Sequence, residues 1–250
     1  MDDATNVHGI FMRIDEIINP NTLLLRLVHY EQLGMDIFLE GDLLEIVDAN
    51  TVETYAHGKV KSIKRLNKDL TVIEFEQPLP QRVKLHDVVG ATVSPAVELK
   101  NCIIRKNRAR GILLGSRENV LVEGNKFHTS GASILTGGDT KYWFEQGGIN
   151  NLTIRNNTFE NCLFGVWGNA IIQLEAGSAK GTDDFPRYNN NVIIENNVFK
   201  VFDPRIINVS SVDGLIFRNN EITQSTDYPS LNALSEPYVL KNCKNVNIQK

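Results

Sequence analysis

The sequence predicts an all-β protein in which the coils of a parallel β-helix follow a small inserted antiparallel β-barrel. A short pattern of apolar residues and asparagine recurs through the second half of the chain, and short alternating stretches separated by turn residues fill most of the first half. At 250 residues the chain can bury a substantial core, and its composition is that of an ordinary globular protein.

The repeat is an apolar-x-apolar triplet, followed three residues later by a bend residue and after two more by a large apolar residue. The triplets are Val97–Leu99, Val120–Val122, Leu152–Ile154, Val192–Ile194 and Leu215–Phe217. The bend residues are Cys102, Asn125, Asn157, Asn197 and Asn220. The period of two indicates strands, and asparagine suits a tight bend because it tolerates the left-handed backbone region. Stacked on copies of itself, asparagine can also form a ladder of side-chain amides.

The spacing of the bend residues predicts a solenoid. They are separated by 23, 32, 40 and 23 residues, which fits one coil length with insertions after Asn125 and Asn157. A further copy begins at Val246. Loops inserted on one face of a solenoid often carry its binding site. The alternative is a β-sandwich with asparagine-rich turns, but five copies in register favour the solenoid.

The segment before the repeat predicts the barrel. It contains short alternating stretches at Leu23–Val28, Leu43–Val47, Val60–Ile63 and Leu70–Phe75, separated by turn residues. Several short strands at near-regular spacing indicate a small antiparallel barrel. We therefore divide the chain into a β-helix remnant at 1–9, a barrel insertion at 10–93 and β-helix coils at 94–250.

Charge and composition exclude several classes of function. The net charge of −4 gives no electrostatic basis for binding nucleic acid or an anionic membrane. No apolar run approaches the ~20 residues of a membrane-spanning helix, and the acidic start does not resemble a signal peptide. Cys102, Cys162 and Cys243 lie far apart without metal-ligand spacing, so we expect buried thiols and no metal site.

Asp2 and Asp3 are the candidate catalytic residues. Glycosidases need one acid to protonate the leaving oxygen and one base to activate water. Neighbours on a strand point to opposite faces, so both can face one cleft only from a strained turn. The alternative is a solvated turn, which is our interpretation of Asp183 and Asp184. His8, the histidine nearest to the pair, is either structural or part of the site.

Two other segments are candidates for binding sugar. Arg108 and Arg110 should lie on one side of a strand, where their forked donors suit carboxylates or sugar hydroxyls, or form a surface charge pair. Asp139, Trp143 and Glu145 lie in a glycine-framed aromatic segment in the first insertion. The aromatic ring can stack on a sugar while the acids bind hydroxyls. Otherwise this segment is a loop that covers the solenoid wall.

The order of four segments resembles glycoside hydrolase family 110 over nearly the whole chain. The segments are Asp2–Gly9, the barrel, Asn107–Leu113 and Gly138–Gly147. The combined pattern is specific, whereas each piece alone is weak. The family comprises α-1,3-galactosidases with a right-handed parallel β-helix, typical of gut and marine bacteria. Some members release the terminal galactose of the blood-group B antigen or of linear α-1,3-galactosides.

The resemblance implies an inverting exo-α-galactosidase that removes terminal α-1,3-linked galactose from an oligosaccharide without a cofactor or metal. It implies that Asp2 and Asp3 occupy the general-base positions. It also implies that the galactose pocket is lined by His8, Arg108, Arg110, Asp139, Trp143 and Glu145. The family's general acid is an aspartate about one coil upstream, so we expect a C-terminal portion that is weakly active or inactive alone. The parent protein is expected to be secreted or periplasmic.

Two other functions stay open at this point. One is a different β-helix polysaccharide hydrolase or lyase, and a lyase would need a calcium site built from several acids and a basic residue that abstracts a proton. The other is a non-catalytic glycan-binding module, in which Asp2 and Asp3 would be replaceable. Unpaired strand edges at a solenoid end also predict a homo-oligomer.

Overall fold

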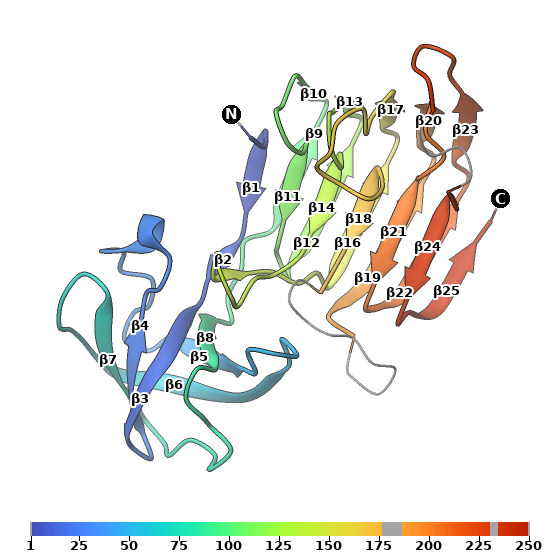
Figure 1. Cartoon of the computed structure of the whole chain (residues 1–250). Coiled ribbons are helices and arrows are strands. Elements are labelled where there is room, and N and C mark those ends of the chain that lie inside the picture. Colours follow the sequence, from blue (N-terminus) through green and yellow to red (C-terminus); the bar gives the residue numbers. More distant parts are fainter. Residues whose placement is uncertain (1, 177–186, 231–234, 250) are drawn as a thin grey trace.

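A computed structural model describes residues 2–176, 187–230 and 235–249 and contains a parallel β-helix and a closed barrel (Figure 1). Asp183 and Asp184 lie outside the described residues. Each coil of the β-helix adds one strand to each of three parallel sheets, which we number in the order in which the chain enters them from residue 97 onward. Sheet 1 contains β9 (Val97–Lys100), β12 (Asn119–Glu123), β16 (Asn151–Arg155), β19 (Asn189–Glu195), β22 (Val212–Arg218) and β25 (Lys244–Ile248).

Sheets 2 and 3 complete each coil. Sheet 2 contains β10 (Ile103–Arg105), β13 (Lys126–His128), β17 (Thr158–Glu160), β20 (Val198–Val201) and β23 (Glu221–Gln224). Sheet 3 contains β1 (Thr5–Val7), β11 (Ile112–Leu114), β14 (Ile134–Thr136), β18 (Ile172–Leu174), β21 (Ile207–Ser210) and β24 (Tyr238–Lys241). The first strand of the chain therefore lies beside β11, at one edge of sheet 3 (Figure 1).

The coils stack in the register that the repeat predicts. The first residues of the triplets are Cα partners across sheet 1, namely Val97, Val120, Leu152, Val192, Leu215 and Val246. The apolar residues after the bend are partners across sheet 2, namely Ile104, Phe127, Phe159, Phe199 and Ile222. The rings of Phe127, Phe159 and Phe199 stack in the core with centroids 4.9 and 4.7 Å apart. The predicted solenoid is therefore confirmed.

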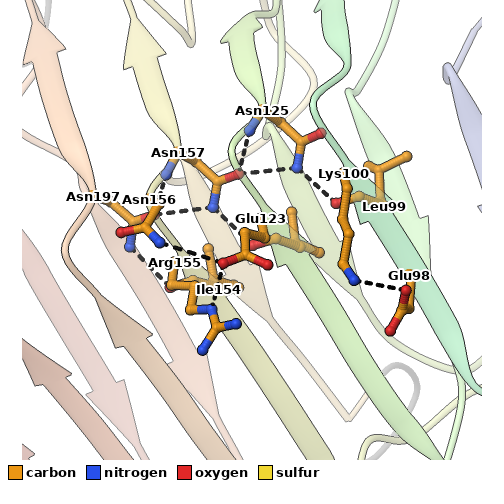
Figure 2. A network of polar contacts seen from close by, with 11 residues as sticks. Glu98, Leu99, Lys100, Glu123, Asn125, Ile154, Arg155, Asn156, Asn157 and Asn197 are labelled. Carbon is orange, nitrogen blue, oxygen red and sulfur yellow. Dashed lines mark hydrogen bonds and ion pairs between the residues drawn. The ribbon is translucent and has the colours of Figure 1, made fainter.

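The predicted amide ladder is also confirmed (Figure 2). Asn157 Nδ2 donates to the Val122 carbonyl at 2.9 Å and to Asn197 Oδ1 at 3.0 Å. Asn157 Oδ1 accepts from the backbone N–H and from Nδ2 of Asn125, both at 2.9 Å. Each buried amide thus satisfies backbone groups of the bend beside it.

The left-handed residue of the bend is not the ladder asparagine, so that part of the prediction was wrong. The residue before the ladder position has a φ between 53° and 68° in each bend, namely Asn101, Gly124, Asn156, Asn196, Asn219 and Asn242. The bend therefore divides the two tasks between neighbours. One residue takes the left-handed conformation at the surface, and the next turns its amide into the coil.

The barrel closes with six antiparallel strands, each paired with the next. Their order is β3 (Met12–Asn19), β4 (Thr22–Arg26), β7 (Leu70–Phe75), β6 (Thr54–Arg65), β5 (Leu43–Val47) and β8 (Val88–Ala91). Strands β5 and β7 have the predicted bounds, β6 is longer, and β3 and β8 were not predicted. The 3-10 helix η1 (Tyr30–Gln32) follows β4, and no helix in the described part of the chain is long and apolar enough to cross a membrane.

The barrel is inserted between β2 (Gly9–Ile10) and β9, and a buried polar cluster fixes it to the β-helix. The cluster is centred on Glu45 of β5, which is fully buried. Its carboxylate accepts hydrogen bonds at 2.5 Å from Arg117 Nη1, from Gln146 Nε2 and from Thr54 Oγ1. Arg117 and Gln146 come from the β-helix, so this Glu45 cluster connects the two units.

Candidate active site

Asp2 and Asp3 are each held by an arginine through a two-pronged ion pair. The carboxylate of Asp2 accepts from Arg108 Nε at 2.7 Å and from Nη2 at 2.8 Å. The carboxylate of Asp3 accepts from Arg110 Nε and Nη2, both at 3.0 Å, and from the Arg110 backbone N–H at 3.1 Å. Four of the predicted site residues therefore contact one another in pairs, although more than 100 sequence positions separate the members of each pair.

These ion pairs form because β1 and β11 are parallel neighbours. The Ala109 N–H donates to the Asp2 carbonyl at 3.1 Å, so the two segments already run side by side before the strands begin. The prediction that Arg108 and Arg110 lie on a strand was wrong, because residues 106–111 form a bend between β10 and β11. Burial still alternates, with Asn107 and Ala109 buried, so both arginines reach outward to the aspartates.

The two carboxylates differ in exposure and environment. The Asp2 side chain is 54% exposed, whereas that of Asp3 is 9% exposed. Hydrogen bonds from Arg108, reinforced by its charge, lower the pKa of Asp2 below its ordinary value of 3.8. Asp2 is therefore an anion at neutral pH, and it can accept a proton or orient water but cannot donate a proton.

His8 and Glu145 form a second group. His8 Nε2 lies 3.3 Å from Glu145 Oε1, and His8 Nδ1 lies 2.7 Å from the Gly9 carbonyl oxygen. The pair forms because β2 is the antiparallel neighbour of β15 (Glu145–Gln146).

Asp139 closes the loop that carries Glu145. Its Oδ1 accepts from the backbone N–H groups of Lys141 at 2.6 Å and Tyr142 at 2.7 Å. Its own N–H donates to the Glu145 carbonyl at 2.8 Å. These contacts give Asp139 a role in shaping the loop, because one carboxylate oxygen is already occupied by the backbone.

Trp143 lies in an aromatic cluster that the barrel completes. Its ring centroid is 4.7 Å from that of His29 and 5.0 Å from that of Tyr142, and the His29 ring is 4.6 Å from that of Tyr30. Trp143 is 45% exposed, whereas His29 is buried. His29 and Tyr30 were not among the predicted site residues. No local signal marked either residue, because the contact of His29 with Trp143 depends on how the barrel docks.

The predicted site residues therefore form two groups at opposite ends of β1. The first contains the two Asp–Arg pairs before β1, and the second contains His8 and Glu145 after it, beside the Trp143 cluster. Asp3 and His8 are five positions apart in an extended segment, which corresponds to up to about 17 Å. Within the described ranges, no group of three or more His, Cys, Asp or Glu side chains could hold a metal ion.

An exposed tryptophan that was not predicted lies on the same stack of coils as the first group. Trp167 is 55% exposed on the loop between β17 and β18. The Gly131 N–H donates to the Ala109 carbonyl at 2.7 Å, and the Ala132 N–H donates to the Trp167 carbonyl at 2.8 Å. The Trp167 backbone is therefore two coils from Arg108 and Arg110 and three coils from Asp2 and Asp3, spacings of about 10 and 14 Å. The aromatic residues of the second insertion were the signal that could have identified it.

Comparison with known proteins places both units in described families. Residues 22–89 match the family GLAA-B beta-barrel domain II, and residues 88–243 match the family right handed beta helix region. The tailspike protein gp49 from Pseudomonas phage LKA1 is a solved structure similar to 89% of this chain and 42% of its own, with a TM-score of 0.25 and 12% identity.

Curated relatives match the whole chain. The chain is 36% identical to alpha-1,3-galactosidase B from Akkermansia muciniphila over 100% of this chain and 32% of the relative. It is 32% identical to alpha-1,3-galactosidase A from Bacteroides fragilis, over 99% of this chain and 42% of the relative. It is 33% identical to alpha-1,3-galactosidase A from Shewanella woodyi, over 98% of this chain and 40% of the relative. The chain thus spans less than half the length of these relatives.

Proposed function

This chain belongs to glycoside hydrolase family 110, with the barrel and the right-handed β-helix of that family, and we propose that it forms part of an inverting exo-α-1,3-galactosidase. The substrate is an oligosaccharide that ends in an α-1,3-linked galactose. The observation that carries the proposal is the pair of adjacent carboxylates, each fixed by its own arginine at the edge of the β-helix.

In this mechanism Asp2 is the general base. Its half-exposed carboxylate is ionised and can orient a water molecule. Asp2 takes a proton from this water as the water oxygen bonds to the anomeric carbon of galactose. The bond from that carbon to the leaving oxygen breaks as a general acid protonates that oxygen, so the released galactose has the β configuration.

Asp3 is the positioning residue of the pair in this proposal. Its side chain is nine-tenths buried, and three N–H groups of Arg110 occupy its oxygens. It therefore fixes the turn from which Asp2 extends. A coil stacked on the free edge of β1 would bring a general acid within one or two coil spacings, or ~5–10 Å, of Asp2. This range includes the 6.5–9.5 Å separation that inversion requires.

The test is galactose release from a linear α-1,3-galactobiose, followed by proton NMR so that the first anomer is observed. It compares this chain with a longer form that carries preceding coils of the relatives' kind. We expect β-galactose first, and we expect Asp2→Asn to reduce kcat at least ~100-fold. The matched control is Asp36→Asn, which removes an exposed barrel carboxylate paired with Arg65 and should leave the rate unchanged.

Release of α-galactose first would contradict inversion, and full activity of Asp2→Asn would contradict the role of Asp2. A third outcome is binding of the disaccharide without turnover in either form, retained in Asp2→Asn and Asp3→Asn. That outcome would replace the proposal with a glycan-binding module.

A further inference from the structure

A groove of about 370 Å³ lies on the outer face of sheet 2, and none of the predicted site residues lines it. Three neighbouring strands, β10, β13 and β17, contribute its walls. The polar side chains that line it include Arg105, Lys126, His128, Glu160 and Asn161. Its size suits a small ligand such as one or two sugar units.

One side of the groove is cationic. Arg105 and Lys126 are exposed, and neither side chain forms an ion pair or hydrogen bond with another residue in the described part of the chain. Ile103 is the Cα partner of Lys126, so Arg105 and Lys126 are diagonal neighbours with Cα atoms on the order of 8 Å apart. Two unpaired cations at this distance form an anion site in a protein of net charge −4.

The other side of the groove presents acceptors. The side chain of Asn161 is 5% exposed; its Nδ2 donates to Asp227 Oδ2 at 2.8 Å, whereas its Oδ1 has no hydrogen-bond partner among the described residues. An unsatisfied buried acceptor is costly, so a donor from a ligand would be favourable here. Lys200 lies 3.1 Å from Glu160 and 3.5 Å from Asp227, so this side of the groove keeps one net negative charge, which only partly offsets the two positive charges of Arg105 and Lys126.

An aromatic ring borders the same groove. The Phe164 ring centroid is 5.1 Å from that of His128, and Phe164 is 45% exposed. His128 is itself fixed, because its Nδ1 lies 2.8 Å from the Glu160 carbonyl oxygen. Anion donors, a hydroxyl acceptor and an exposed ring together match a sugar that carries an acidic group, since its C–H face can pack on the ring.

We propose that this groove binds an acidic saccharide unit. Its sulfate or carboxylate group lies between Arg105 and Lys126, a hydroxyl donates to Asn161 Oδ1, and its apolar face packs on Phe164. The site is separate from Asp2 and Asp3 and does not depend on the proposed hydrolysis. It would hold an acidic region of a glycan on the flank of the β-helix.

The test is isothermal titration calorimetry of the whole chain with galactose 6-sulfate, galacturonic acid and galactose. We expect at least one acidic sugar to bind more tightly than galactose, and we expect added salt to weaken this binding. Preference for one acidic sugar identifies the anionic group as sulfate or carboxylate. Equal affinity for galactose would overturn the proposal.

A matched pair of double variants assigns the binding to the groove. Arg105→Thr with Lys126→Thr should weaken binding at least 10-fold, and threonine is already the in-register neighbour of Lys126 at position 158. Lys64→Ser with Lys68→Thr removes the same charge from the exposed barrel surface and should change nothing. Equal loss in both double variants, or no loss in the first, would refute the site. Asp2→Asn should bind normally, which separates this test from that of the hydrolase.

Discussion

Replacing Asn157 by alanine should lower the free energy of unfolding by about 4 kcal/mol. The Asn157 side chain is 1% exposed and makes four hydrogen bonds, to the Val122 carbonyl, to Asn197 Oδ1 and twice to Asn125 (Figure 2). A neutral hydrogen bond contributes about 1 kcal/mol net, so four contribute about 4 kcal/mol. Alanine also leaves the buried Asn125 N–H without its acceptor, so the loss of unfolding free energy should be at least this large.

Two other substitutions in the bends provide a scale for the loss expected from Asn157→Ala. Asn156→Gly changes the exposed left-handed residue next to the ladder and should stay within about 1 kcal/mol of the wild type, because Gly124 occupies the same position one coil earlier. Asn220→Ala removes three hydrogen bonds from a half-buried side chain and should cost about 2–3 kcal/mol.

Urea unfolding followed by circular dichroism measures the three variants on one scale. The expected order of destabilisation is Asn157→Ala, then Asn220→Ala, then Asn156→Gly. A loss below 1 kcal/mol for Asn157→Ala, or an equal loss for Asn156→Gly, would refute the reasoning that the inward amides stabilise the coils.

Three further outcomes are expected. Phe159→Ala should cost about 3–5 kcal/mol in the same unfolding assay, because it removes the middle ring of the core stack. Gly131→Ala should accelerate hydrogen exchange in residues 161–171, since a methyl group would lie 1.9 Å from the Trp167 carbonyl oxygen; unchanged exchange would argue against this contact. Arg108→Ala should raise the pKa of Asp2 toward 3.8 in a carboxyl NMR titration. The stabilisation from that pair is present above pH 3.8 and is lost as the pH falls through the lower folded pKa, so an unchanged titration midpoint would contradict the pairing.

Sheets 1 and 2 could be predicted because the triplet, the bend residue and the following apolar residue lie within one short stretch of sequence. Sheet 3 could not, because its strands follow loops of unequal length. Residues 106–111 separate β10 from β11, whereas residues 225–237 separate β23 from β24. Variable loops shift the third strand relative to the repeat, so no fixed period marks it.

In the candidate site, too, the residue types could be predicted from the sequence, whereas their contacts could not. Asp2, Asp3, Arg108 and Arg110 could be selected by residue type, but their one-to-one pairing depends on β1 lying beside β11. The His8–Glu145 contact likewise depends on the short pairing of β2 with β15. The neighbours of Trp143 on the barrel could not be selected, because docking of an inserted unit is a tertiary event that local patterns do not encode.

The way in which the barrel enters and leaves the β-helix has a consequence for how such proteins diversify. Its first and last strands, β3 and β8, are hydrogen-bonded neighbours, so about 80 residues begin and end only one strand spacing apart. An unstructured loop of that length would cost roughly 3 kcal/mol more to close than a four-residue turn. A prefolded insert avoids this cost, so the coil on which it sits experiences little more than a hairpin. The chain connections therefore allow a whole domain to be gained or exchanged at this position while the stacking of the coils is preserved, as long as Arg117 and Gln146 keep a partner such as Glu45.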